Sequence, residues 1–306
     1  MGAGIPIAAA AAAGGLFLRS RYEEKHFVTE NYEIRSEKVP EAFDGFRFIM
    51  LADLHGFQFG DGLKGLKKTL VRLDPDAVIC VGDMILGDPG ADMSAAFDLY
   101  RFMDRRWPVL ASLGNHEQRL RLYREDFRDM GPLYEAELAK TRVHMLDNRS
   151  ILLKRDGGSV RVTGLTLQRW FYRRHRLRPM PAAYLNETLG KCDRNCYNIL
   201  AAHNPFYFRD YARWGADLVL SGHVHGGVII LPGLGGLLSP QVEFFPEYYA
   251  GHYREGASDM IVSRGLYMHR LRVRLNNLPE ISCVTLRHLK RKDRTADGDD
   301  IQASGL

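Results

Sequence analysis

Five of the eleven histidines in this sequence stand in short clusters with Asp, Asn and Gly. The side chains in these clusters are imidazoles, carboxylates and an amide, without a thiolate. Such a set favours a site for Mn, Fe, Zn or Co and disfavours a structural zinc site, which is usually rich in cysteine. The clusters therefore predict metal ligation. In chain order they are Asp53-Leu54-His55, Gly82-Asp83, Gly114-Asn115-His116-Glu117, His203 and Gly222-His223-Val224-His225.

Each cluster directly follows a short apolar run. Runs of this length that are rich in Val, Ile and Leu are typical of strands buried on both faces. Residues 63–73 place apolar side chains at helical spacing with Lys and Arg between them, which predicts a covering helix. The sequence thus predicts a layered α/β fold with its polar clusters at the carboxyl ends of strands, where such sheets bind ligands. The predicted strands are residues 46–51, 76–81, 108–113, 197–202 and 216–220.

Taken singly, each cluster also has an ordinary explanation. Asp is common in the turn after a strand, which would account for Asp53 near His55. A buried His116 could be a structural histidine with satisfied hydrogen bonds. His223 and His225 carry the strongest local signal, because residues i and i+2 of an extended segment point the same way, although a solvated loop is the alternative. That every cluster follows an apolar run favours one common site.

The ordered blocks resemble the signature of the calcineurin-like metallophosphoesterase superfamily. Within this superfamily, the sequence most resembles the bacterial membrane-associated phosphodiesterase branch. Two features carry that resemblance: Gly226-Gly227 after the last histidine and an apolar segment before the domain. The resemblance covers residues 32–286 and implies a four-layer α/β/β/α sandwich with two divalent metal ions. It implies that Asp83 bridges the ions and that His116 lies beside the scissile phosphate. One ion would be held by Asp53, His55, Asp83 and His225, and the other by Asp83, Asn115, His203 and His223.

Such a centre predicts a reaction. Two ions about 3.5 to 4 Å apart can clamp the attacking and leaving oxygens at phosphorus and acidify a bridging water. We therefore expect a binuclear phosphohydrolase that cleaves a phosphodiester or pyrophosphate with a metal-bridging hydroxide. If protonated, His116 would stabilise the transition state or protonate the leaving oxygen. The alternatives are a phosphomonoesterase of soluble metabolites and a non-catalytic metal-binding interaction module. Residues 84–88 lack the Asp-Arg-Gly of protein Ser/Thr phosphatases, so that class is disfavoured.

Three further segments bear on the substrate. Residues 168–179 interleave arginines with aromatic residues, and these types suit phosphate and a membrane interface. Arg173 and Arg174 are therefore candidate contacts to an anionic substrate, a lipid-linked one included, or to a membrane surface, with a solvated loop as the alternative. Nucleic acid is disfavoured, because it would need a wider basic track. Arg264 is another candidate phosphate contact. Residues 231–253 predict a rim on the substrate side, with core packing as the alternative.

The two ends of the chain differ from the rest. Residues 1–25 contain an uncharged, alanine-rich run followed by basic residues, which predicts a membrane anchor with the catalytic domain on the cytoplasmic side. A cleaved signal peptide, which would make the protein secreted, and a disordered apolar arm are the alternatives. Residues 26–289 are the predicted metallophosphoesterase domain. Residues 290–306 mix charges of both signs with small residues, which predicts a flexible tail.

The overall composition is that of a globular protein. The 306 residues are 45% hydrophobic and 26% charged, which excludes a collagen, a disulfide scaffold and a largely disordered chain. A net charge of +5 is compatible with an anionic substrate or membrane surface, but too small to indicate nucleic acid. Cys80 and Cys283 lie in apolar runs and are expected to be buried thiols. Cys192 and Cys196 could pair only in an oxidising compartment.

Overall fold

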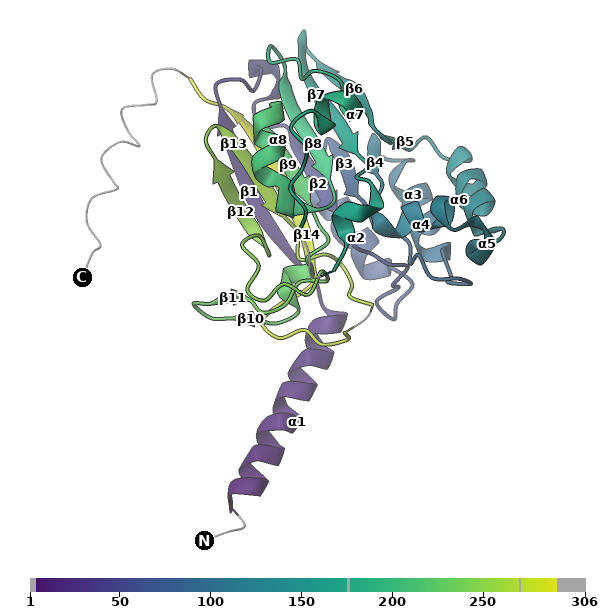
Figure 1. Cartoon of the computed structure of the whole chain (residues 1–306), viewed down its shortest axis with the longest axis vertical. Coiled ribbons are helices and arrows are strands. Elements are labelled where there is room, and N and C mark those ends of the chain that lie inside the picture. Colours follow the sequence, from purple (N-terminus) through teal and green to yellow (C-terminus); the bar gives the residue numbers. More distant parts are fainter. Residues whose placement is uncertain (1–3, 175–176, 270, 291–306) are drawn as a thin grey trace, which may run out of the picture.

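The computed structural model describes residues 4–174, 177–269 and 271–290. Two six-stranded mixed sheets pack face to face, with helices on their outer faces (Figure 1). In spatial order, the first sheet contains β1 (Val28–Ser36), β14 (Glu280–His288), β2 (Arg47–Leu51), β3 (Ala77–Val81), β4 (Val109–Ser112) and β5 (His144–Met145). The second contains β12 (Gly251–Glu255), β13 (Ser258–Val262), β9 (Leu218–Ser221), β8 (Tyr197–Ala202), β7 (Gly158–Leu165) and β6 (Arg149–Arg155).

Helices on the outer faces of the sheets complete the predicted four-layer α/β/β/α sandwich, whereas α1 (Gly4–Lys25) projects from one end of it (Figure 1). The other α-helices of the described residues are α2 (Lys64–Leu73), α3 (Ser94–Met103), α4 (Asn115–Leu122), α5 (Arg124–Phe127), α6 (Met130–Ala139), α7 (Tyr184–Leu189) and α8 (Phe208–Trp214). Short 3-10 helices are η1 (Glu41–Phe43), η2 (Arg169–Tyr172), η3 (Pro205–Tyr207) and η4 (His225–Gly227). A small hairpin is formed by β10 (Ile230–Leu231) and β11 (Gly235–Gly236).

Strand β2 shows why apolar runs build these layers. Successive side chains of a strand point to opposite faces. Phe48 and Met50 therefore enter the core between the two sheets, and Ile49 and Leu51 enter the core under the helices of the first sheet. All five predicted strands are confirmed to within two residues at each end, and the predicted helix 63–73 is α2.

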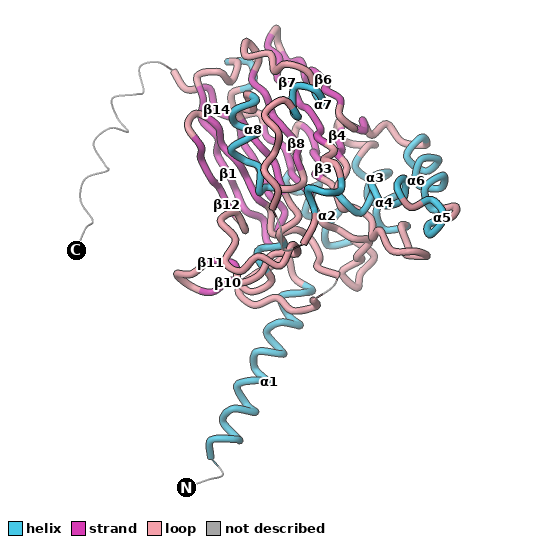
Figure 2. The backbone as a smooth tube through the Cα atoms, in the orientation of Figure 1, coloured by secondary structure: helices cyan, strands magenta, loops and turns pink. Residues whose placement is uncertain are grey.

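The sheet topology brings the polar clusters to one edge. Strands β2, β3 and β4 run parallel in the first sheet, and β7, β8, β9 and β13 run parallel in the second. Each polar cluster follows the carboxyl end of one of these strands. Figure 2 shows many of the loops gathered at the end of the molecule from which α1 projects.

Helix α1 is joined to the domain by its last turns. The backbone N–H of Arg274 donates to Ser20 Oγ at 3.1 Å, and the N–H groups of Asn276 and Asn277 donate to the buried carboxylate of Glu23 at 3.1 and 2.8 Å. The preceding residues Leu16, Phe17 and Leu18 are exposed. No helix in the described part of the chain combines the length and apolar character needed to cross a membrane. Most of the predicted tail, residues 291–306, lies outside the described residues, so the tail stays a prediction.

The four cysteines, all within the described ranges, are free thiols. Cys80 and Cys283 are buried, as the sequence predicts. Cys192 and Cys196 are partly buried, and their thiols donate to the Gly215 carbonyl at 3.3 Å and to the Asp193 carboxylate at 3.5 Å.

Candidate metal centre

The structure brings the seven predicted ligands together from both sheets. Each lies in the loop, or at the helix start, that follows a strand. All but Asn115 are buried, and Asn115 is partly buried. Gathering carboxylates and imidazoles in the interior is costly unless they meet opposite charge. The seven are Asp53 and His55 after β2, Asp83 after β3, Asn115 after β4, His203 after β8, and His223 and His225 after β9.

The carboxylates and imidazoles divide into two clusters. Asp53, His55 and His225 form one, and Asp83, His203 and His223 form the other, with the potential ligand atoms of each cluster within 4.8 Å of one another. In the first cluster, Asp53 Oδ1 lies 3.7 Å from His55 Nε2 and 3.6 Å from His225 Nε2.

The two clusters adjoin. His203 Nε2 lies 3.1 Å from Asp83 Oδ2 and 3.6 Å from Asp53 Oδ1, so it faces one carboxylate of each cluster. Each cluster consists of three residues from one of the two predicted ligand groups.

Unpaired polar atoms show that these residues fit metal ions. A buried polar atom in a folded protein normally has a hydrogen-bond partner. Within the described residues, several of the predicted ligand atoms are buried and find no such partner, and a cation would satisfy them. They are Asp53 Oδ1, His55 Nε2, Asn115 Oδ1, His223 Nε2 and His225 Nδ1.

The electrostatics of the site also favour cations. Burial lowers the pKa of His55, His223 and His225 well below the ordinary histidine value, which leaves these rings neutral at neutral pH. Burial alone would lower the pKa of His203, but the carboxylates of Asp83 and Asp53 outweigh burial and raise it to about 10. The two carboxylates therefore stabilise positive charge between the clusters.

The backbone of the site is strained. Five of the seven predicted ligands have positive φ: Asp53 at 56°, His55 at 47°, Asp83 at 53°, His223 at 70° and His225 at 53°. Such angles are uncommon outside glycine, and the strain clusters at functional sites.

Glycines in the motifs allow the loops to approach closely. A Cβ on Gly82 would lie 2.4 Å from the backbone nitrogen of Gly114, and one on Gly222 would lie 2.5 Å from Asp53 Oδ2. Glycine is therefore required before Asp83 and before His223 for steric reasons.

One ligand is oriented by a backbone carbonyl. His203 Nδ1 lies 2.7 Å from the Val81 carbonyl oxygen, which can only accept a hydrogen bond. Nδ1 therefore carries a proton, and a metal ion at Nε2, which faces the two carboxylates, would replace the second proton of the ring. A second contact of this kind fixes the tautomer of many metal-binding histidines.

Glu117 joins the loops after β3 and β4. Its buried carboxylate accepts hydrogen bonds from four backbone N–H groups, those of Asp83 (2.9 Å), Met84 (2.7 Å), Ile85 (3.3 Å) and Gly114 (2.9 Å). Glu117 thereby positions both Asp83 and the turn that carries Asn115. Sequence reasoning placed this residue in a motif without assigning it a role.

His116 begins helix α4 and points into the site. Its Nδ1 accepts the Gly87 N–H at 2.8 Å, so the proton of a neutral ring lies on Nε2. Nε2 is 3.9 Å from Asp83 Oδ2. Burial lowers the pKa of His116 to about 3. The ring therefore offers an N–H donor to the site while it is uncharged.

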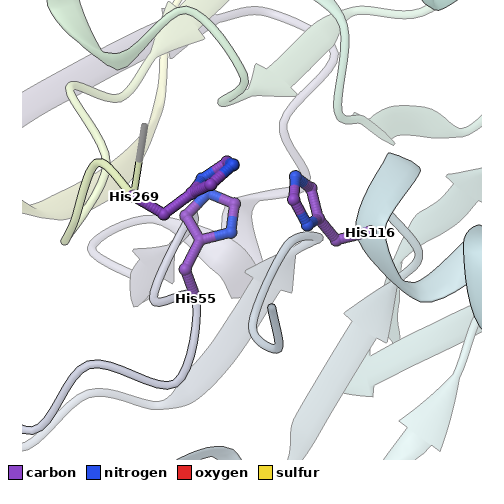
Figure 3. Close-up of side chains that lie close together, drawn as sticks. All are labelled: His55, His116 and His269. Atoms are coloured by element: carbon purple, nitrogen blue, oxygen red, sulfur yellow. The ribbon is translucent and has the colours of Figure 1, made fainter. Parts of the chain in front are cut away.

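His269, which sequence reasoning left without a role, lies beside His55 and His116. The ring centroids are 4.6 Å apart for His55 and His269 and 4.7 Å apart for His116 and His269. Figure 3 shows the three rings converging from different segments of the chain. His269 follows β13 in an irregular stretch that has no motif of its own, so only the fold reveals its position.

A cavity of about 470 Å³ opens above the clusters. The predicted residues Arg173 and Arg174 line it, together with Arg169 of the same arginine-rich segment and Arg119, which the sequence did not single out. Predicted metal ligands and arginine residues therefore line the same cavity.

Two buried amides fix the arginine-rich segment to the site. Asn204, next to His203, donates to the Phe171 carbonyl at 3.2 Å and to Gln241 Oε1 at 2.9 Å. Gln241 in turn donates to the carbonyls of Phe171 and Arg173 at 3.2 and 3.0 Å. Gln241 also lines the cavity, as predicted for part of segment 231–253.

Arg264 does not reach the cavity, and this corrects the expectation of a phosphate contact. Its guanidinium pairs with Glu280 at 2.9 Å and with Glu30, and its side chain is largely buried. Both carboxylates lie on the strands β14 and β1. Arg264 therefore ties the end of β13 to the first sheet.

Asn277 holds the loop that carries His225. Its amide nitrogen donates to the carbonyls of His225 and Val228 at 2.7 and 3.0 Å, and its own backbone N–H donates to Glu23 on α1. Helix α1 is thus linked to a predicted metal ligand through one buried residue. Nothing local in the sequence indicates this link.

Comparisons with known proteins agree with this geometry. Residues 46–227 match the family model described as calcineurin-like phosphoesterase. The chain is 28% identical to the uncharacterized metallophosphoesterase YkuE of Bacillus subtilis, over 92% of this chain and 93% of that protein. It is 25% identical to phosphodiesterase YaeI of Escherichia coli, over 79% and 82%. It is 26% identical to the transmembrane protein with metallophosphoesterase domain of Danio rerio, over 83% and 56%.

Proposed function

Since this chain belongs to the calcineurin-like phosphoesterase family, we propose that its reaction is the hydrolysis of a phosphodiester or pyrophosphate bond. The observation that carries the proposal is the set of unpaired ligand atoms in two adjoining clusters under a cavity with guanidinium walls. The similarity to phosphodiesterase YaeI of Escherichia coli supports a diester substrate.

The metal ions would be held by the seven ligands, with Asp83 shared between them. Two divalent cations there would supply charge that stabilises the attacking and leaving oxygens and would lower the pKa of bound water. Arg173 and Arg174, which line the cavity, would bind the anionic oxygens of the substrate.

His116 would act as a hydrogen-bond donor. A second proton on its ring would have to sit on Nδ1, which already accepts the Gly87 N–H. The geometry therefore favours the first of the two roles expected from the sequence, stabilisation of charge on the phosphoryl group, and does so with a neutral ring. Proton donation to the leaving oxygen would require an imidazolium or leave an imidazolate, and the surroundings of His116 favour neither.

The test is metal analysis coupled to a substrate panel. We expect the full chain to retain about two divalent ions and, after chelation and reloading with Mn, Fe, Zn or Co, to hydrolyse bis(p-nitrophenyl) phosphate faster than p-nitrophenyl phosphate. A preference for the monoester would support a phosphomonoesterase of soluble metabolites instead. Binding of the ions without turnover of any ester would support an interaction module.

The His116→Asn variant tests the role of the ring. Loss of one donor aimed at developing charge lowers kcat by about 100- to 1000-fold. We expect this loss with unchanged metal content, because His116 is not among the predicted ligands. His144→Asn, on the exposed strand β5, is the matched control and should retain full activity. A His116→Asn enzyme with wild-type kcat would contradict the role.

We further propose that the protein associates with a membrane through α1, with the catalytic domain on the cytoplasmic side. Leu16, Phe17 and Leu18 are exposed and directly precede the basic residues Arg19 and Arg21. Such an order suits an apolar segment in lipid with its cationic end at the cytoplasmic surface. The name of the Danio rerio relative is in keeping with a membrane location.

Vesicle flotation tests the association. We expect the full chain to float with vesicles of phosphatidylcholine and phosphatidylglycerol, and replacement of Leu16, Phe17 and Leu18 by Ser to lower the bound fraction about tenfold. The matched control replaces three exposed apolar residues on other elements, Val71, Leu133 and Leu152, by Ser. Equal flotation of the α1 variant and the control would exclude this role of α1.

A further inference from the structure

We propose that an apolar pocket beside the metal clusters binds the hydrocarbon chain of an amphiphilic phosphoester substrate. This inference rests on the proposed phosphoester hydrolysis and adds to it the chemical class of one substituent of the ester. It assigns a binding site to residues that have no part in metal binding: Val228, Leu238, Val242, Met268 and Leu271.

The pocket adjoins the catalytic cavity. It has a volume of about 290 Å³, and four residues line both spaces: Arg174, His225, Pro240 and His269. His225 is also a member of the first metal cluster. A phosphoryl group held at that cluster therefore has one substituent that can pass His269 directly into the pocket.

The two spaces differ sharply in chemistry. Side chains that line only the catalytic cavity include Arg119, Arg169 and Arg173, which suit anionic oxygens. Side chains that line only the pocket are apolar apart from Ser239, and they include Leu238, Met268 and Leu271. A ligand that satisfies both is anionic at the metal clusters and apolar beyond His269, which describes an ester of phosphate with a long alkyl or acyl-bearing alcohol.

Two residues that line the pocket have an unfavourable backbone conformation. Val228 and Val242 both have a φ of 64°, a region in which β-branched residues are rare. Both side chains face the pocket. The Val228 carbonyl accepts a hydrogen bond from the Asn277 side chain, which also donates to the His225 carbonyl. Strain retained in this way is typical of ligand sites.

The pocket also lies near exposed apolar surface. Leu271, in its wall, is 49% exposed, and the neighbouring Val273 is 40% exposed. Arg274, next in the chain, is bonded to Ser20 at the base of α1. In Figure 1, the hairpin β10–β11 lies beside the base of α1. An alkyl chain would therefore meet apolar side chains both inside the pocket and at the end of the molecule from which α1 projects.

Alkylphosphonates test the pocket, because they carry a phosphoryl head and a chain but no ester bond to hydrolyse. Their Kd for the metal-loaded full chain would be measured by calorimetry, from methyl to octyl, below the micelle concentration. We expect Kd to fall about fourfold for each added methylene until the pocket is full. A Kd that is independent of chain length would overturn the proposal.

Two variants locate the effect. Leu238→Gln combined with Leu271→Gln should flatten the dependence on chain length and leave the Kd of methylphosphonate unchanged. The single variant Leu271→Gln, at an exposed position, should reduce the dependence of Kd on chain length in part. Leu152→Gln, an exposed leucine on β6, is the control. An undiminished dependence in the double variant would place the chain elsewhere and refute the assignment.

Hydrolysis of bis(p-nitrophenyl) phosphate is followed in the same preparations. If the ester is not hydrolysed while the phosphonate series keeps its dependence on chain length, the proposed reaction fails and the pocket stands. If the ester is hydrolysed and the series is flat, the pocket fails and the reaction stands.

Discussion

Replacement of Asp83 by Asn is expected to abolish hydrolysis and to empty much of the metal centre. One carboxylate oxygen of Asp83 accepts a hydrogen bond from the backbone N–H of His116 at 2.8 Å, and the other lies 3.1 Å from His203 Nε2. If the NH2 group of the introduced amide replaced the first oxygen, it would face the backbone N–H of His116, which is also a donor. If it replaced the second oxygen, a predicted metal-ligand atom would be lost. We expect kcat/KM to fall at least about a thousandfold, because the charge that holds both ions is lost.

Elemental analysis and hydrolysis of bis(p-nitrophenyl) phosphate measure this effect together. The control is Asp156→Asn, at an exposed turn between β6 and β7, which should keep both activity and metal content. Unchanged circular dichroism would show that the Asp83→Asn chain is folded. Hydrolysis by the Asp83→Asn variant at the wild-type rate would contradict the proposed mechanism.

Replacement of Glu117 by Gln is expected to lower the stability of the fold and, as a consequence, the metal affinity. Each carboxylate oxygen of Glu117 accepts two backbone N–H groups, so an amide nitrogen at either position would face two donors in the interior. We expect the free energy of unfolding to fall by about 3 kcal/mol. We also expect metal affinity to fall about 10- to 100-fold, because Asp83 and the turn before Asn115 lose their common support.

Urea unfolding of the chelated protein separates the stability effect from metal binding. Glu135→Gln is the matched control, since the Glu135 side chain is 63% exposed, and it should change the free energy of unfolding by less than about 0.5 kcal/mol. If Glu117→Gln unfolded at the same urea concentration as the wild type, the four hydrogen bonds would not have the stabilising role assigned to them.

The sequence predicted those parts of the fold and site that depend on local pattern. Residues 46–51 alternate between two apolar cores, so their composition identifies a buried strand before any partner is known. The ligand clusters follow such strands, and parallel strands bring them to one edge. By contrast, the edge strand β1 was not predicted, because its residues are mostly polar and half exposed.

The contacts that the sequence did not reveal are those made between distant loops. His269 reaches His55 from a segment more than two hundred residues further along the chain, and Asn277 reaches the carbonyl of His225 across 52 residues. The misassignment of Arg264 has the same origin. Its partners Glu30 and Glu280 become its neighbours only when β1 pairs with β14.

The contacts of Glu23 connect the N-terminal helix to the loops around the predicted metal site. Composition suggests a boundary at residues 25 and 26, yet Ser20 and Glu23 accept three backbone N–H groups from the loop that steadies His225. A chain trimmed to begin at His26 would carry every metal ligand and still leave those donors without acceptors. The proposed membrane attachment and the support of the His225 loop therefore depend on the same helix.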